Sequence, residues 1–258
     1  NYNMADTRGT FRLKNVRQDI LNDEYVPIPA VWVSDTTTTG YYAGGYVGGN
    51  VNIPYPTPSS IENATAVSKL TYSSSSIARE PSANLPDKNV DSGPFTSSSA
   101  GYMLGGVNNA QGRNTYLRKL TYSSDTTANV PGGTVGPSWG WQAMATFNDG
   151  DTKGYATGGK SGPSQDPVGG TNLTRSMPFS TQTWGSIPTI GTAIGHNGQP
   201  IVSSTAGYVA GGRNDFTPGP AGFLRSWMQK FTFSTDANSR TPSMDLTYSI
   251  KMMSGASN

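Results

Sequence analysis

The sequence predicts an all-β fold, and its composition and two motifs that recur in phase support this expectation. Glycine and proline are abundant, with 32 and 18 residues among 258, while 13% of the residues are charged and 34% are hydrophobic. Glycine supplies the positive φ of tight turns and proline presets the first residue of a turn, whereas both residues disfavour helices. The composition therefore favours many short strands joined by tight turns.

The first motif has the form GYxxGG and occurs four times, at intervals of 61, 53 and 53 residues. The copies begin at Gly40, Gly101, Gly154 and Gly207. A double glycine lets a strand bend sharply or lets two backbones approach closely. The tyrosine before it can pack its ring between neighbouring sheets while its hydroxyl reaches a polar partner. We expect each copy to form one strand.

The second motif alternates apolar and polar residues around an aromatic residue and recurs at intervals of 50, 57 and 54 residues. The copies read SKLTYSSSS around Tyr72, RKLTYSSDT around Tyr122, RSMPFSTQT around Phe179 and QKFTFSTDA around Phe233. Such alternation is typical of a strand with one buried face. Two different motifs with one period indicate an internal repeat.

Weaker features complete each repeat. A short apolar run precedes each GYxxGG, at Val31–Val33, Phe95, Ala143–Phe147 and Ile201–Val202, and a proline-marked turn follows the second motif, as in Thr183–Pro188. Each repeat is therefore expected to contain four short strands. Four strands in a period near 50 residues predict one blade of a β-propeller. The predicted blades span about 31–91, 92–139, 140–195 and 196–245, with a partial fifth at 246–258.

The two ends of the chain call for separate interpretations. Ile250–Met253 resembles a leading apolar strand, and we favour a truncated sequence or an open assembly over a ring that this strand completes near Gly40. Residues 1–30 do not fit the repeat: Phe11 and Leu13 suggest a strand, Val16 and Ile20 have helical spacing, and two prolines follow. This segment is either a docking element or a strap packed on the first blade.

The motifs resemble a known family. LRKLTYSSDT at 117–126 is the best match to the kelch-like repeat of virion proteins in tailed bacteriophages, cyanophage fibre and appendage proteins above all, and FTFSTDA at 231–237 is the next best. FSTQTWGSIP at 179–188 resembles the general kelch pattern, although the usual kelch tryptophan is present only as Trp184. The resemblance covers about residues 31–258 and implies a kelch-like β-propeller.

The resemblance also implies a function, which is that of a non-enzymatic structural protein of the virion. Such a tail or neck fibre or appendage subunit serves assembly and contact with the host surface. Residues 4–16, MADTRGTFRLKNV, resemble the docking start of these proteins, so the expected partners are other virion proteins, further copies of the chain, and a host glycan or protein. The alternative is a secreted carbohydrate-binding or glycan-acting β-propeller.

One stretch spells a phosphate-binding loop. GYATGGKS at 154–161 has the spacing of that motif, which must lead into a helix whose N-terminal amides hold the phosphates. The residues that follow, GPSQDPVGGTN, disfavour a helix, and the three sister copies of GYxxGG lack the lysine and serine. The sequence therefore predicts a strand here rather than a nucleotide site.

Other candidates for chemistry are weak, so we expect no catalytic, metal or cofactor site. His196 is the single histidine and the chain has no cysteine, which disfavours a catalytic triad or a zinc site. NDGD at 148–151 is interpreted as a hairpin turn rather than a calcium site. The net charge of +2 without a basic run argues against nucleic acid. No apolar stretch approaches the roughly 18 residues of a membrane span.

Two long loops carry aromatic residues among glycines and prolines. The loops span 45–66 and 214–227, and their aromatic residues are Tyr46, Tyr55, Phe216, Phe223 and Trp227. Exposed aromatic residues on such loops suit contact with a carbohydrate or a protein. Because large aromatic residues are mostly buried, we favour the interpretation that they cover blade edges or subunit contacts.

Overall fold

The computed structural model describes fifteen segments of the chain. These segments are 30–33, 38–44, 46–47, 62–63, 65–87, 89, 92–108, 112–113, 115–135, 144–159, 173–188, 199–214, 223–224, 226–240 and 242–247. Several residues with predicted roles lie outside them, namely Phe11, Leu13, Val16, Ile20, Tyr55, Lys160, Ser161, His196, Phe216 and Ile250–Met253.

Four antiparallel sheets of four strands confirm the all-β prediction, and we call each sheet a blade. Blade 1 contains β1 (Ala30–Val33), β2 (Thr39–Ala43), β5 (Val67–Thr71) and β6 (Ser76–Arg79). Blade 2 contains β7 (Gly93–Thr96), β8 (Ala100–Leu104), β11 (Leu117–Thr121) and β12 (Thr126–Asn129). Blade 3 contains β13 (Ala145–Asn148), β14 (Lys153–Thr157), β15 (Thr174–Pro178) and β16 (Gly185–Ser186). Blade 4 contains β17 (Gln199–Val202), β18 (Ala206–Ala210), β21 (Met228–Thr232) and β22 (Ala237–Arg240).

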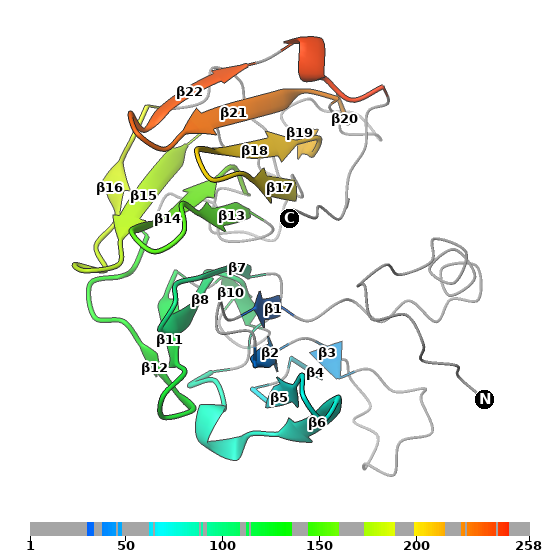
Figure 1. Cartoon of the computed structure of the whole chain (residues 1–258), viewed down its shortest axis with the longest axis vertical. Helices are drawn as coiled ribbons and strands as arrows, with labels where there is room; N and C mark the ends of the chain where they lie inside the picture. The colour runs from blue at the N-terminus through cyan, green and yellow to red at the C-terminus, as the bar shows by residue number, and fades with distance from the viewer. Residues whose placement is uncertain are drawn as a thin grey trace.

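The blades follow one another in chain order around a common centre. The first strand of each blade contacts the first strand of the next, so that β1 contacts β7, β7 contacts β13 and β13 contacts β17. Figure 1 shows these four strands on the inner side of the fan, with the last strands β6, β12, β16 and β22 at its outer edge. The arrangement is propeller-like, as expected for strands that pair in chain order within each blade.

Within the described segments, three blades carry a small antiparallel ribbon between their second and third strands. The ribbons pair β3 (Tyr46–Val47) with β4 (Glu62–Asn63), β9 (Val107–Asn108) with β10 (Gly112–Arg113), and β19 (Arg213–Asn214) with β20 (Phe223–Leu224). The GG pair separates blade from ribbon: Gly105 and Gly106, for example, have φ of 66° and 103°. Only glycine adopts such angles readily, which explains why the motif ends in GG. Short 3₁₀ helices, η1 (Pro81–Ala83) and η2 (Pro242–Met244), follow blades 1 and 4.

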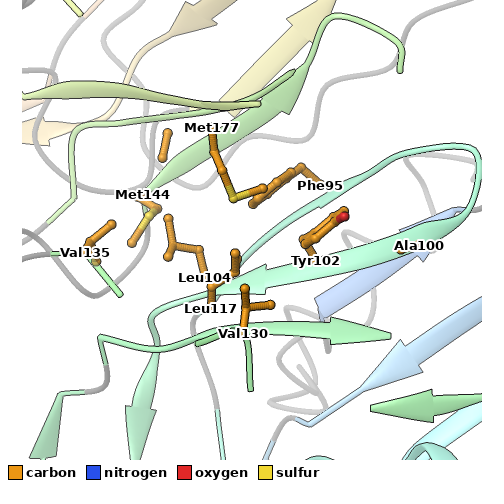
Figure 2. Close-up of a cluster of buried hydrophobic side chains, with 10 residues drawn as sticks. Phe95, Ala100, Tyr102, Leu104, Leu117, Val130, Val135, Met144 and Met177 are labelled. Carbon is orange, nitrogen blue, oxygen red and sulfur yellow. The ribbon is translucent and has the colours of Figure 1, made fainter. Parts of the chain in front are cut away.

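The hydrophobic core lies between successive blades. The largest cluster joins Phe95, Tyr102 and Leu117 of blade 2 to Ala156 and Met177 of blade 3. Figure 2 shows Met177 directed from blade 3 towards Phe95, whose ring lies beside that of Tyr102. Two further clusters fill the spaces between blades 1 and 2 and between blades 3 and 4. Each blade thus buries its faces against its neighbours, as stacked repeats require.

Candidate functional site

The two sequence motifs meet at every junction between blades. The tyrosine of GYxxGG in one blade stacks on the aromatic residue of the second motif in the next blade. The ring centroids are 5.5 Å apart for Tyr41 and Tyr122, 5.2 Å for Tyr102 and Phe179, and 5.4 Å for Tyr155 and Phe233. Offset stacks of this spacing add to the energy of burial. We call each such junction an interblade joint.

A tight turn between the third and fourth strands supplies the polar part of the joint. Ser75, Asp125, Gln182 and Asp236 occupy the same place in the four turns, and all four have φ between 50° and 53°. Non-glycine residues seldom adopt this left-handed conformation, and aspartate is among those that tolerate it. In blades 2, 3 and 4 the turn therefore directs one side chain towards the preceding blade.

Two of the three joints hold an aspartate with a tyrosine and a lysine. Asp125 of blade 2 accepts hydrogen bonds from the Tyr41 hydroxyl at 2.5 Å and from Lys69 Nζ at 2.6 Å. Asp236 of blade 4 accepts them from the Tyr155 hydroxyl at 2.8 Å and from Lys153 Nζ at 2.7 Å. Hydrogen bonds to a charged group are the strong ones, so these aspartates clamp their blade to the one before it.

The lysine reaches this place from two different strands. Lys69 lies on β5, directly opposite Tyr41 of β2, and cross-strand neighbours point to the same face of a sheet. Lys153 lies on β14 itself, two residues before Tyr155, and alternate residues of a strand also share a face.

The middle joint lacks the carboxylate. Gln182 Nε2 donates a hydrogen bond to the Tyr102 hydroxyl at 3.4 Å. Lys119 lies opposite Tyr102, in the place that corresponds to Lys69, and within the described segments its side chain forms no hydrogen bond or ion pair. This joint is therefore expected to be the weakest in its polar part, because a lysine faces an amide instead of a carboxylate.

A second polar contact recurs two residues after the left-handed turn residue. Thr127 Oγ1 donates to the carbonyl of Ala83 at 2.8 Å, and Trp184 Nε1 donates to the carbonyl of Gly133 at 3.0 Å. Asn238 Nδ2 likewise donates to the carbonyl of Pro188. In each case the acceptor lies after the last strand of the preceding blade. Three different side chains thus satisfy the same kind of backbone acceptor.

The first glycine of GYxxGG lies against an aromatic ring of the preceding blade. A Cβ atom on Gly154 would lie 2.3 Å from Cε2 of Phe95, and one on Gly207 would lie 2.5 Å from Cε2 of Phe147. Nonbonded carbon atoms normally approach to about 3.5–4.0 Å. The motif therefore requires glycine at this position so that two blades can approach closely.

The interblade joints raise the pKa values of their tyrosine side chains and of Lys69. Burial raises the pKa of Tyr41, and its hydrogen bond to Asp125 raises it further. The same two causes, with Asp236 as the acceptor, raise the pKa of Tyr155 far above its ordinary value. The hydrogen bond to Asp125 also raises the pKa of Lys69. The tyrosines therefore stay neutral and the lysine charged well into the alkaline range.

Two stretches that resemble chemical motifs contain a strand and a turn of blade 3. Gly154, the first residue of the apparent phosphate loop, lies inside β14 opposite Met177 of β15. Within NDGD, Asp149 Oδ1 accepts from the Lys153 amide at 2.7 Å, which closes the turn between β13 and β14. Asp151 accepts from the amide and hydroxyl of Ser98 in blade 2, and these bonds lower its pKa.

A buried ion pair is the polar feature that the sequence did not reveal. Arg118 is fully buried and forms two bonds to Asp87, Nε to Oδ1 at 2.6 Å and Nη2 to Oδ2 at 2.8 Å. Its Nη1 donates to the carbonyl of Gly105 at 3.2 Å. Asn89 donates to the same carbonyl at 3.1 Å. The pair holds the segment between blades 1 and 2 against the GG pair of blade 2.

The loop aromatics fall into three groups. Tyr46 and Phe223 lie in the ribbon strands β3 and β20, opposite Asn63 and Asn214. Trp227 is half-buried beneath the Arg240 guanidinium, which lies 4.6 Å from its ring centroid. Tyr55 and Phe216 are outside the described segments. Trp227 therefore packs against a residue of its own blade.

Two kinds of feature, a membrane-spanning helix and a metal-binding cluster, are absent from the described residues. These residues contain no helix long and apolar enough to span a membrane. They also contain no group of three or more histidine, cysteine, aspartate or glutamate side chains placed to hold a metal ion.

Comparisons with known proteins support the fold alone. No family model matches the sequence, and no curated protein is a significant match. Among solved structures, the chain is similar to that titled "Structure of YjhT", with a TM-score of 0.68 and 14% sequence identity. The match covers 89% of this chain and 73% of YjhT. At this identity the likeness concerns the arrangement of the strands.

Proposed function

We propose that the chain is a kelch-like β-propeller subunit of a tailed-phage fibre or appendage, with a structural and host-contact role rather than a catalytic one. The observation that carries the proposal is the use of the motif residues. Tyr41, Asp125, Tyr155 and Asp236, which belong to the motifs resembling the phage repeat, bind one another between blades. Motifs of this kind specify a scaffold.

The ribbons that follow the GG pairs are the proposed contact surface. They join the second strand to the third in blades 1, 2 and 4, so they emerge from the same end of each blade. Variable loops carried by a rigid scaffold are a common location for binding residues. We assign host contact to this end, in particular to the loops 45–66 and 214–227.

The remaining parts of the proposal concern assembly. The N-terminal segment 1–30, with Phe11, Leu13, Val16 and Ile20, would dock the propeller on other virion proteins. The chain would act in several copies on the particle. Its location would be the virion, and its external partner a host-surface glycan or protein.

Antibodies against the chain test this proposal. Immunogold labelling of purified particles should mark an appendage, and Fab fragments should reduce adsorption to host cells. The matched control is a Fab raised against a capsid protein of the same particle. Labelling confined to the particle-free fraction of the lysate would contradict the proposal, as would turnover of a glycan by the purified chain. That second result would support the alternative of a glycan-acting propeller.

A further inference from the structure

Blade 4 presents one complete half of an interblade joint, and no other described residue completes it. Tyr208 corresponds to Tyr41, Tyr102 and Tyr155, each of which is at most 2% exposed, yet Tyr208 is only half-buried. Ile201 lies opposite Tyr208, in the place that Phe95 and Phe147 occupy in the earlier blades. Ile201 is 39% exposed, whereas Phe95 and Phe147 are 4% and 2% exposed. The difference marks the face that no following blade covers.

The charged member of the joint is also in place. Lys230 of β21 lies opposite Tyr208 of β18, as Lys69 lies opposite Tyr41. In the first joint this register places the lysine and the tyrosine hydroxyl on one carboxylate. Among the described residues, the side chains of Tyr208 and Lys230 form no hydrogen bond or ion pair.

We propose that the face formed by Ile201, Tyr208 and Lys230 binds a further repeat of the same kind, whose turn carries an aspartate in the left-handed conformation. The completed joints define what this partner needs, and the first joint, which combines the same lysine register with an aspartate, defines the polar contact. A glycine must lie over Ile201, as Gly154 lies over Phe95. An aromatic ring must stack on Tyr208. A carboxylate must reach the Tyr208 hydroxyl and Lys230 Nζ together.

Charge complementarity selects this partner over blade 1 of a second copy. Blade 1 offers Tyr72, which is 39% exposed, but Ser75 occupies its turn position. A serine carries no charge for Lys230 and is shorter than aspartate.

One substitution turns blade 1 into a probe for this face. Ser75→Asp places a carboxylate at an exposed turn residue with φ of 50°, where aspartate is readily tolerated. A second copy carrying S75D then offers both the aromatic ring and the carboxylate. A hydrogen bond to a charged group is worth about 1.5–3 kcal/mol, which converts to a roughly 10- to 100-fold lower Kd of self-association. The Kd can be measured by sedimentation velocity over a concentration series.

Matched variants separate the possible outcomes. Ser75→Asn has the same shape without the charge and should leave the Kd at the wild-type value. Lys230→Met in the S75D chain should remove the gain, whereas Lys119→Met, at the same register in blade 2, should keep it. Equal association of S75D and S75N would overturn the proposal. So would Lys230-dependent association of the wild-type chain, because a second copy would then bind without a carboxylate. Ser75→Glu provides a second carboxylate probe if S75D impairs folding.

Discussion

Gly154→Ala tests directly whether the blades are held by close approach of a glycine to an aromatic ring. The added Cβ would lie 2.3 Å from Cε2 and 2.5 Å from Cδ2 of Phe95, whereas ordinary carbon contacts are about 3.5–4.0 Å long. The ring cannot easily withdraw, because Phe95 is 4% exposed and its ring centroid is 5.3 Å from that of Tyr102 and 5.9 Å from that of Trp184.

The expected cost follows from two opposing effects. Overpacking of a dense core costs about 1–3 kcal/mol, and this contact belongs at the upper end because ring and backbone are both confined. Replacement of glycine by alanine also lowers the conformational entropy of the unfolded chain, which stabilises the folded state by about 0.4–1 kcal/mol. We therefore expect a net loss of about 2 kcal/mol in the free energy of unfolding. For a chain of this size that loss lowers Tm by roughly 4–8 °C.

Differential scanning calorimetry measures the change in Tm. Two further variants show whether the clash with Phe95 causes it. Gly185→Ala is the matched control, since the nearest atom to its Cβ would be 3.9 Å away, and its Tm should not fall. Phe95→Leu in the Gly154→Ala background should recover part of the loss, because the smaller side chain leaves room for the methyl group. A Gly154→Ala Tm equal to that of the wild type would refute the reasoning, as would strict additivity of the two substitutions.

Three further outcomes are expected. Gln182→Asp should raise the free energy of unfolding by about 0.5 kcal/mol, because it gives Lys119 the carboxylate that the middle joint lacks. Chemical denaturation measures this gain in stability. The free energy of unfolding should fall as the pH rises above 10. Folding raises the pKa of Tyr155 above its ordinary value of 10.0, so the neutral phenol contributes its full stabilisation below pH 10 and loses it as it ionises. Tyr155→Phe should therefore flatten the dependence of Tm on alkaline pH. Asp87→Asn should cost about 3 kcal/mol in urea unfolding, because it leaves the fully buried Arg118 without a counter-charge.

Each of these outcomes has a matched control. Gln182→Asn keeps the amide and should not stabilise the chain, so an equal gain would contradict the role given to the charge. The Tyr155→Phe chain is itself the control for the alkaline profile, because an equally steep fall of Tm with pH in that variant would contradict the role given to the phenol. Asp245→Asn breaks the pair with Arg240, whose side chain is 40% exposed. It should cost clearly less than Asp87→Asn, because water screens the exposed pair.

The sequence was informative about the fold because its motifs recur at a regular interval, which shows the length of one repeat. GYxxGG and the alternating second motif correctly predicted strands in all four blades, and residues 154–157 of the apparent phosphate loop lie in one of those strands, as predicted. The joints could not be predicted, because a repeat does not show which residue of the next copy faces it. A pattern was nevertheless present, since Asp125 and Asp236 occupy the same place in two copies. Nothing in the sequence links Asp87 to Arg118, which lie 31 residues apart.

The interblade joint has a direction, since each blade offers its tyrosine to the blade that follows and its turn residue to the blade before. Every copy of the repeat carries both the tyrosine and the turn residue. In the gene, duplication or loss of one whole repeat would therefore join complementary halves again, without any compensating mutation elsewhere. A lineage could change the number of binding loops in single recombination events. The mixed turn residues, Asp125, Gln182 and Asp236, would then set how tightly each new neighbour is held.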